Sequence, residues 1–319
     1  MSTSRFLAFM ICQILIGLCI AAPASTQLTS SSASQTATAS AAVKTSTAAP
    51  TANADAWWPK VNSTWQIVLN APIKVPTDGS PLTPNADVWD IDMFSNPAST
   101  VSALHNLGKG FICYFSAGSY EPGRPDSSQF KPTDLGNTLD GWPDENWLDI
   151  RSTNVRNIMA ARIALAKSKG CDAVDPDNVD GYNNDNGLGL TQQDTIDYVN
   201  FLASTAVANG ISIGLKNAIE VLPQVMPAVQ FAVNEQCYGY GECDSYVPIV
   251  ESGKAVFHIE YPNKPIGKVK GKNLKNICNA GSLPSVPDPA ITLSTVLKNT
   301  DLSGLVQLCN GTVAKTPTQ

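Results

Sequence analysis

The chain has 319 residues, and 21 Lys and Arg against 27 Asp and Glu give it a formal net charge of −6 at pH 7. An acidic protein is a poor partner for nucleic acid or an anionic membrane surface and a better one for a cationic substrate. Only two histidines are present, His105 and His258, so a histidine-based catalytic triad is not expected.

The first residues resemble an export signal. Arg5 precedes an apolar run over residues 6–22, which ends in Ala22-Pro23-Ala24. We therefore expect residues 1–24 to be a signal peptide that is removed on export. The run is also about as long as a short membrane span, so an uncleaved membrane anchor remains the alternative.

Residues 25–54 consist almost wholly of Ser, Thr, Ala, Gln and Pro, too little apolar material to form a core, and we expect a disordered, O-glycosylated linker. Asn62-Ser63-Thr64 and Asn310-Gly311-Thr312 are N-glycosylation acceptors. The expected location is extracellular, with association to the cell surface or wall left open. We expect a monomer.

Residues 55–319 have the length of one (β/α)8 barrel domain, and segments with a strand pattern alternate with segments with a helix pattern. β-Branched and aromatic runs predict strands at 64–69, 88–94, 110–116, 170–177, 211–215, 228–233, 255–259 and 291–297. Helical spacing with caps predicts helices at 101–109, 152–169, 191–207, 218–225, 243–252 and 272–280. The Pro- and Gly-rich segment 122–149 is too long for a plain connection and indicates a functional loop over the barrel mouth.

Six cysteines lie outside the signal segment, an even number that indicates disulfides in an exported chain. We expect Cys237 to pair with Cys243, and Cys278 with Cys309. Cys113 and Cys171 lie in neighbouring predicted strands, where they are either bonded to each other or buried as thiols. The spacing of the cysteines does not indicate a metal site, and we expect neither metal nor cofactor.

Three carboxylates follow the fourth predicted strand, at Asp175, Asp177 and Asp180. Side chains alternate along a strand, so Asp175 and Asp177 share a face if the strand continues through Pro176. Polar groups at the carboxyl ends of strands are the pattern of barrel enzymes. An acidic surface turn or a calcium loop is the alternative, although a calcium loop would need a glutamate at its twelfth position that this segment lacks.

Carboxylates without histidine or cofactor chemistry favour glycoside hydrolysis by two acids. Asp177 is the expected nucleophile. Glu235 directly follows an apolar strand and is the expected proton donor, with a pKa raised by burial. For Glu235 a helix-capping or salt-bridging role is the alternative.

Five blocks in the same order resemble glycoside hydrolase family 114, the fungal secreted endo-α-1,4-polygalactosaminidases. They are Asp90-Ile91-Asp92-Met93-Phe94, Cys113 to Glu121, Gly170 to Tyr182, Val233 to Cys237, and His258 to Tyr261. The resemblance spans about residues 57–309. It implies a (β/α)8 barrel that cleaves α-1,4-linked galactosamine within galactosaminogalactan-type polymers, with Asp177 as nucleophile and Glu235 as acid/base.

The implied polymer is cationic or partly acetylated, so carboxylates and aromatic side chains are expected around it. The expected substrate-binding residues are Asp92, Tyr114, Ser116, Gly118, Asp175, Asp180, Lys216, Asn217, Asn234, Glu260 and Tyr261. Trp57 and Trp58 either cap the barrel base or stack on sugars. A catalytically inactive carbohydrate-binding barrel and a hydrolase of another α-linked glycan remain alternatives.

Overall fold

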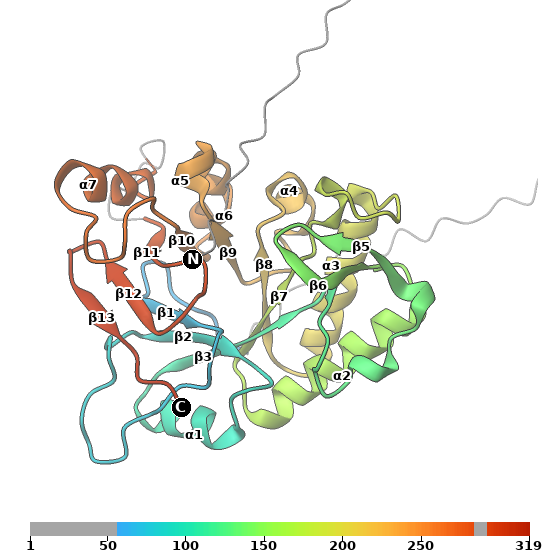
Figure 1. Ribbon diagram of the computed structural model, residues 1–319, viewed down its shortest axis with the longest axis horizontal. Helices are drawn as coiled ribbons and strands as arrows, with labels where there is room; N and C mark the ends of the chain where they lie inside the picture. The colour runs from blue at the N-terminus through green and yellow to red at the C-terminus, as the bar shows by residue number, and fades with distance from the viewer. Residues whose placement is uncertain (1–55, 284–291) are drawn as a thin grey trace, which may run out of the picture. The chain divides into compact units, whose positions relative to one another are not determined.

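Eight parallel strands follow one another around a (β/α)8 barrel in the computed structural model, which describes residues 56–283 and 292–319 (Figure 1). The expected signal peptide and linker, residues 1–24 and 25–54, lie outside the described residues. The eight strands are β1 (Trp65–Val68), β2 (Val88–Asp92), β3 (Gly110–Ser116), β7 (Ala173–Asp177), β8 (Ser212–Lys216), β9 (Phe231–Glu235), β10 (Ala255–Glu260) and β11 (Ser294–Leu297). The predicted barrel is confirmed, with every predicted strand present and its ends shifted by a few residues.

The two ends of the parallel sheet meet between β1 and β11. The indole nitrogen of Trp65 donates to the carbonyl of Ser294 at 2.6 Å, and the ammonium of Lys298 donates to the carbonyl of Ile67 at 2.7 Å. Two further strands, β12 (Leu305–Leu308) and β13 (Val313–Lys315), extend the sheet antiparallel from β11.

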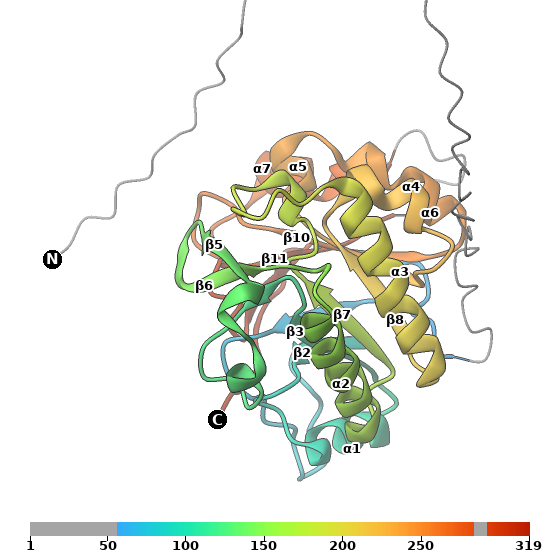
Figure 2. The ribbon, with the colours of Figure 1, turned by 90° about the vertical axis from the view of Figure 1, so that its right-hand side faces the viewer.

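Helices cover the outside of the parallel strands, with α1, α2 and α3 visible in Figure 2. The longest are α2 (Thr153–Lys169), which Ser152 caps through its hydroxyl and Gly170 ends at φ +92°, and α3 (Gln192–Ala208), which Thr191 begins. The remaining helices are α1 (Ala98–Asn106), α4 (Leu222–Val225), α5 (Cys237–Tyr240), α6 (Val247–Glu251) and α7 (Gly271–Ala280). The connection from β1 to β2 has no helix, as its Pro- and Gly-rich sequence predicts.

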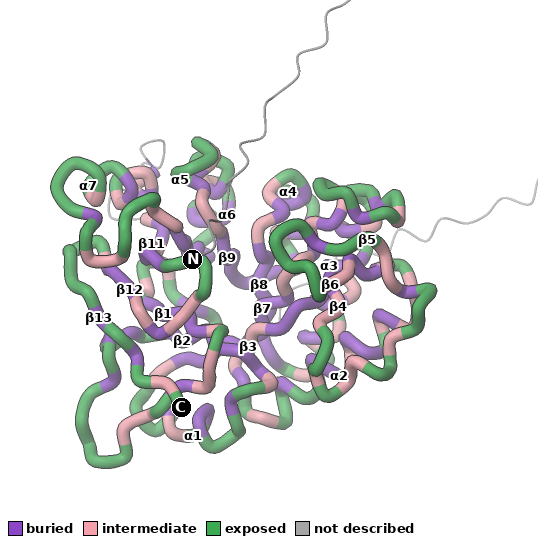
Figure 3. Tube along the Cα trace, in the orientation of Figure 1, coloured by how far each residue is buried: buried purple, intermediate pink, exposed green. Residues whose placement is uncertain are grey.

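Two apolar clusters reflect the alternation of side chains along the strands. Ala173 and Val233 face the barrel interior, whereas Val174 and Ala232 pack outward against the helices. The eight barrel strands are buried along most of their length, and exposed residues gather in the loops and on the outer helices (Figure 3). On the interior side of β7, Asp175 and Asp177 therefore follow Ala173 toward the mouth, and the strand continues through Pro176 as expected.

The segment after β3 is an insertion rather than a plain loop. It contains β4 (Ser119–Tyr120), β5 (Leu135–Leu139) and β6 (Trp142–Leu148), which form a separate antiparallel sheet in the order β4-β6-β5. The short strand β4 follows directly on β3, so this sheet stands at the carboxyl end of the barrel strands. It occupies the segment for which the composition predicted a functional loop.

Three disulfides join the six cysteines: Cys113 with Cys171, Cys237 with Cys243, and Cys278 with Cys309. The two expected pairs are present, and the open question about Cys113 and Cys171 is answered by a bond between β3 and the start of β7. No helix among the described residues is long and apolar enough to cross a membrane.

Trp57 lies at the opposite end of the barrel from the insertion. Its ring fills the space beside Gly110, and its carbonyl accepts a hydrogen bond from Ser212; these two residues begin β3 and β8. This is the base-capping position, not a sugar-binding one. Trp58 beside it contacts the ammonium of Lys254, which immediately precedes β10.

Candidate active site

Three neighbouring strands, β7, β8 and β9, end in Asp177, Lys216 and Glu235. The ammonium nitrogen of Lys216 lies 3.2 Å from Asp177 Oδ2 and 3.5 Å from Glu235 Oε2. The two carboxylate oxygens are therefore no farther apart than the sum of these distances. One buried cation thus holds two predicted catalytic acids together at the barrel mouth.

The residue after each of these three strand ends has left-handed backbone geometry. The φ angles are +60° at Asn178, +48° at Asn217 and +64° at Gln236. Non-glycine residues rarely adopt this region, and they cluster where backbone geometry serves a site. The chain thus turns sharply away once each functional side chain has been placed.

Asp177 accepts hydrogen bonds at both carboxylate oxygens. The hydroxyl of Tyr114 donates to Oδ2 at 3.0 Å, beside Lys216, and the backbone N–H of Asn178 donates to Oδ1 at 2.8 Å. These donors fix the orientation of the carboxylate. Such a carboxylate is suited to act as a nucleophile.

Glu235 is held by Asn217, Tyr261 and Lys216. Asn217 donates from Nδ2 to Oε2 at 3.0 Å, and the hydroxyl of Tyr261 donates to Oε1. Burial raises the pKa of Glu235, but the attraction of Lys216 and the hydrogen bonds from Tyr261 and Asn217 outweigh it, so the pKa lies below its ordinary value. The expectation of a raised pKa was therefore wrong, because the apolar strand leads into a polar, cationic environment.

Lys216 is itself fully buried, and its ammonium lies 5.6 Å from the centre of the Tyr114 ring. Burial alone lowers the pKa of Lys216, but Asp177, Glu235 and Asp175 attract the cation and raise its pKa well above the usual value. The lysine is therefore a permanent cation between the two acids.

A cavity of about 440 Å³ opens beside Glu235. Its acidic lining residues are Asp180, Glu220, Glu235 and Glu242. Burial and the charge of Asp177 raise the pKa of Asp180 to about 6. A ring on the rim, Tyr240, is 71% exposed, the largest exposed fraction among the large hydrophobic side chains that the structure describes.

A second cavity of about 380 Å³ lies on the insertion, lined by Glu121, Arg124, Trp142, Asp144 and Glu145 among others. Trp142 is 58% exposed, so one ring face is free to contact a ligand.

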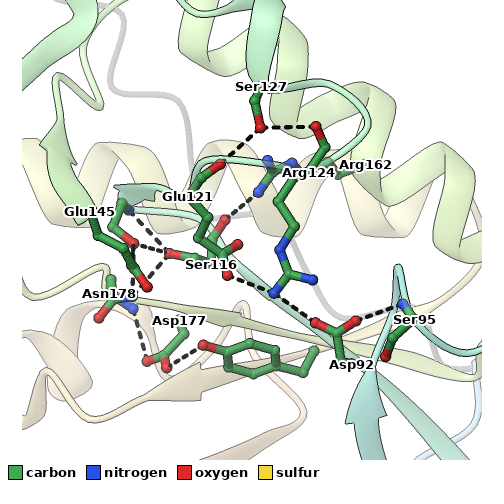
Figure 4. Close-up of polar contacts among 12 residues, drawn as sticks. Asp92, Ser95, Ser116, Glu121, Arg124, Ser127, Glu145, Arg162, Asp177 and Asn178 are labelled. Atoms are coloured by element: carbon green, nitrogen blue, oxygen red, sulfur yellow. Dashed lines mark hydrogen bonds and ion pairs between the residues drawn. The ribbon is translucent and has the colours of Figure 1, made fainter. Parts of the chain in front are cut away.

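A chain of hydrogen bonds connects this second cavity with Asp177 (Figure 4). Asn178, whose backbone holds Asp177, donates from its amide to Ser119 Oγ at 3.1 Å, and Ser119 donates to Glu145 Oε2 at 2.7 Å. Glu235 thus lines the first cavity directly, and Asp177 is connected to the second through Asn178 and Ser119.

Six of the expected substrate-binding residues are buried within the protein. Asp175 is fully buried, and neither of its carboxylate oxygens has a hydrogen-bond partner among the described residues. The other five contact the protein itself: Asp92 bonds Arg124, Ser116 bonds Ser119 and Asn178, Gly118 packs on the Asn178 backbone, Asn234 bonds Tyr246 and Cys237, and Glu260 bonds His258 and the start of α5. A carbon added at Gly118 would come 1.6 Å from the Asn178 carbonyl oxygen, so only a glycine allows the chain to pack this closely on itself here.

Tyr114, Lys216, Asn217 and Tyr261 directly contact the acids, and Asp180 lines the first cavity. The sequence reasoning missed Glu121, Arg124, Trp142, Glu145 and Asn178. For Arg124, Trp142 and Glu145 the only signal was the composition of the 122–149 segment, which does not say which side chains face the strands. Glu121 and Asn178 lie within two of the five resembling blocks.

Among the described residues, one group of three side chains has metal-ligand proximity: Cys237, Cys243 and His258. Both sulfurs belong to a disulfide, so neither is available as a thiolate. The imidazole of His258 instead bonds Glu260 and Thr295.

Comparison with known families and structures gives a consistent result. The sequence model of the protein family 'Glycoside-hydrolase family GH114' matches residues 46–314 of this chain. A crystal structure of Aspergillus fumigatus Ega3 in complex with galactosamine is similar at 47% identity and a TM-score of 0.72, covering 81% of this chain and 99% of that one.

The glycoside hydrolase domain of PelA from Pseudomonas aeruginosa is similar in fold alone. It is 12% identical, with a TM-score of 0.51, and the match covers 81% of this chain and 99% of that one. A comparison with curated proteins found no match.

Proposed function

The chain belongs to glycoside hydrolase family GH114, and from this premise we propose that it cleaves α-1,4 linkages between galactosamine units inside a galactosaminogalactan-type polysaccharide. The similarity to Ega3, which was crystallised with galactosamine, supports an amino sugar as the substrate unit. The observation that carries the proposal is the placement of Asp177 and Glu235 on either side of the Lys216 ammonium.

Asp177 would attack the anomeric carbon while Glu235 protonates the leaving oxygen, and Glu235 would then remove a proton from the water that releases the sugar. Retaining enzymes hold their carboxyl groups about 5–5.5 Å apart, and inverting enzymes about 6.5–9.5 Å apart. The two contacts to Lys216 limit the separation of these oxygens to at most the sum of 3.2 and 3.5 Å, which lies below most of the inverting range and favours retention.

The acidic lining of both cavities supports a cationic polymer. A galactosamine unit without its acetyl group carries an ammonium, which forms charge-assisted hydrogen bonds with carboxylates. Asp180 and Glu220 offer such groups beside Glu235, and Asp144 and Glu145 do so beyond Asp177. Carboxylates on both sides of the cleaved bond suit an enzyme that binds several sugar units on each side of that bond, as endo action requires.

Exposed rings at both cavities add stacking surfaces. Tyr240 lines the first cavity and Trp142 the second, and aromatic faces suit the apolar faces of sugar rings. Export to the extracellular space fits the three disulfides, and both Asn62 and Asn310 are exposed, as glycan attachment requires.

The test is release of reducing ends from partly deacetylated galactosaminogalactan, with fully acetylated polymer and chitosan beside it. Asp177→Asn and Glu235→Gln should each reduce the rate by at least about a thousandfold. The matched controls Asp197→Asn and Glu251→Gln change exposed acids on α3 and α6 and should retain full activity.

Equal cleavage of chitosan would contradict the linkage preference. Binding of the polymer without any release of reducing ends would instead support a carbohydrate-binding barrel.

A further inference from the structure

A third cavity, of about 590 Å³, adjoins the first one at the barrel mouth. Gln236, Tyr240 and Tyr261 line both cavities. The hydroxyl of Tyr261 also donates to Glu235, so this ring connects the third cavity with the proposed acid/base. The lining includes the carboxyl end of β10, the strand next to β9 in the sheet. A polysaccharide that fills the first cavity can therefore continue into the third.

Two helices contribute the walls of this third cavity. Tyr238 comes from α5, and Asn273 and Ile277 come from α7; the two helices lie close to each other in Figure 1 and again in Figure 2. A disulfide holds each helix, at Cys237 in α5 and at Cys278 in α7. Walls that are fixed before binding reduce the entropy cost of holding a ligand.

The third cavity differs from the first in charge. Four carboxylates and no lysine or arginine line the first cavity, whereas the third has one carboxylate, Glu260, and one lysine, Lys264. Glu260 is itself buried. Its Oε1 accepts from the backbone N–H of Tyr238 at 2.7 Å and lies 2.9 Å from His258 Nε2. The first cavity therefore attracts an ammonium group, and the third does not.

A basic stretch runs along the same side of the third cavity, in a chain whose formal net charge is −6. It consists of five exposed lysines, Lys264, Lys268, Lys270, Lys272 and Lys275. None of the five forms an ion pair with another residue that the structure describes. Val269 and Asn273, which line the cavity, lie between these lysines in the chain. Their charges repel a galactosamine ammonium but not an uncharged sugar.

An N-acetyl group consists of a methyl and an amide, and the lining offers partners for both. Val269 and Ile277 are apolar and nearly buried, so they lie deep in the cavity, where a methyl can be buried. Asn263 and Asn273 are exposed, and a carboxamide can donate to the acetamide carbonyl and accept from its N–H. Tyr238 is 39% exposed and offers a ring for the apolar face of a sugar.

We propose that the third cavity is a subsite for an N-acetylated galactosamine unit. One polysaccharide chain then places units with a free ammonium in the first cavity and an acetylated unit in the third. This inference rests on the proposed function, because both cavities must bind the same chain. A partly acetylated polymer is therefore a better substrate than a fully deacetylated one.

The first experiment measures binding without any cleavage. The probes are the methyl α-glycosides of N-acetylgalactosamine, galactosamine and galactose, none of which contains the linkage that the proposed reaction breaks. Isoleucine methyl groups labelled with ¹³C report each cavity by NMR, since Ile219 lines the first and Ile277 the third. The two signals are assigned with Ile219→Val and Ile277→Val.

The N-acetylgalactosamine glycoside should shift the Ile277 signal, and the galactosamine glycoside should shift the Ile219 signal. The proposal is wrong if no glycoside shifts Ile277, or if galactosamine does so at the same or a lower concentration. It is also wrong if galactose binds beside Ile277 as tightly as N-acetylgalactosamine, because the acetyl group then contributes nothing.

A charge reversal tests why the ammonium is excluded. In Lys264→Glu the galactosamine glycoside should bind beside Ile277 about fivefold more tightly, because attraction replaces repulsion. The matched control is Lys275→Glu, which makes the same change at an exposed lysine that does not line the cavity, and which should alter this affinity less than twofold. Equal effects would show that only the overall charge matters and would overturn the local exclusion.

A double variant tests how the acetyl group is recognised. Asn263→Ala/Asn273→Ala should weaken binding of the N-acetylgalactosamine glycoside about tenfold, because the amide contacts are lost. Asn276→Ala/Asn279→Ala is the matched control, since these exposed asparagines line a different cavity and should leave the affinity unchanged. Unchanged binding in the first double variant would overturn the assignment.

Kinetics separate this proposal from the proposed function. The wild type should have a higher kcat/KM on partly acetylated polymer than on the fully deacetylated one, and Asn263→Ala/Asn273→Ala should reduce this ratio. Cleavage without that preference, together with an unshifted Ile277 signal, would refute the subsite and leave the proposed function intact. A shifted Ile277 signal without cleavage of any polymer would refute the proposed function and leave the binding site.

Discussion

Asn217 holds Glu235 by two hydrogen bonds at once. Its Oδ1 accepts from the backbone N–H of Glu235 at 2.9 Å, and its Nδ2 donates to the Glu235 carboxylate at 3.0 Å. One side chain thus positions both the backbone and the acid of the neighbouring strand. Its own φ of +48° directs it toward β9.

Asn217→Ala should lower kcat by about 10- to 100-fold, because a misplaced acid loses its alignment with the leaving oxygen. KM should change less, since the carboxylates that line the cavities remain. The matched control is Asn85→Ala, an exposed asparagine whose side chain bonds Lys109 away from the active site. A normal kcat in Asn217→Ala would contradict the positioning role.

Lys216→Met should destabilise the fold and impair catalysis. Removal of the buried cation leaves Asp177 and Glu235 repelling each other, at a cost of about 3–5 kcal/mol in the free energy of unfolding. Lys254→Met is the control, since Lys254 is also buried but donates only to the Met226 carbonyl and has no carboxylate partner among the described residues. Urea unfolding and reducing-end assays of both variants measure the difference.

Trp142→Ala should weaken binding of long polymer chains. Loss of one stacking surface at the second cavity should raise KM for the polymer about 5- to 30-fold, equivalent to about 1–2 kcal/mol. Short oligomers that do not reach this cavity should be cleaved as before. Trp58→Ala, at the opposite end of the barrel, should change neither, and equal effects of both variants would contradict a binding role.

Asp134→Asn should weaken the attachment of the insertion to α2. Asp134 accepts from the hydroxyl of Ser152 at 2.7 Å, the amide of Asn154 at 2.7 Å and the backbone of Lys131 at 2.8 Å. The asparagine amide would place an N–H₂ donor where one carboxylate oxygen accepts hydrogen bonds. This change should cost about 1–3 kcal/mol in the free energy of unfolding.

The effect of Asp134 should depend on pH. Burial raises the pKa of Asp134, but these three hydrogen bonds outweigh it and lower the pKa below its usual value. The stability it contributes is therefore complete above the unfolded pKa of about 3.9 and is lost as pH falls through the lower folded value. The free energies of unfolding of wild type and Asp134→Asn should therefore become equal at this low pH. A difference between the two proteins that stays constant with pH would contradict this account.

Loss of the disulfide between Cys113 and Cys171 should be the most damaging of the three. This disulfide closes a loop of 58 residues, and both of its cysteines are buried. The disulfide between Cys278 and Cys309 closes a loop of 31 residues, and that between Cys237 and Cys243 a loop of 6. The double variant Cys113→Ala/Cys171→Ala should lose about 4 kcal/mol in the free energy of unfolding. Cys278→Ala/Cys309→Ala is the comparison, and a larger loss there would contradict the loop-length argument.

Much of the barrel was predictable because its signals are local. The capping residues Ser152 and Thr191, the helix-ending Gly170 and the apolar strand runs each report on a few neighbouring residues. The ends of parallel strands meet at one edge, so Asp177 and Glu235 were expected to lie together, and they do.

The roles of the polar residues around these two acids were less predictable. Asp92, Asp175 and Glu260 stand at or near strand ends as the pattern requires, yet all three are buried. Asp92 bonds Arg124, and Glu260 bonds the backbone of Tyr238, contacts that the sequence does not predict. Trp142 and Glu145 lie in the insertion, whose composition indicates function but not the direction of any side chain.

The sequence by itself determined the fold class and that Asp177 and Glu235 stand at strand ends, because alternation, caps and strand-end carboxylates follow from short-range chemistry. The family followed from the resemblance of five sequence blocks. Only the tertiary structure decided the charge environment. Lys216 and Asp177 are 39 residues apart in the chain, but their side chains are 3.2 Å apart in space. The charge of Lys216 also acts on Glu235, where it opposes burial and helps to lower the pKa below its ordinary value. Electrostatic interactions depend on distance in space, and that distance is set by how the strands close into a barrel.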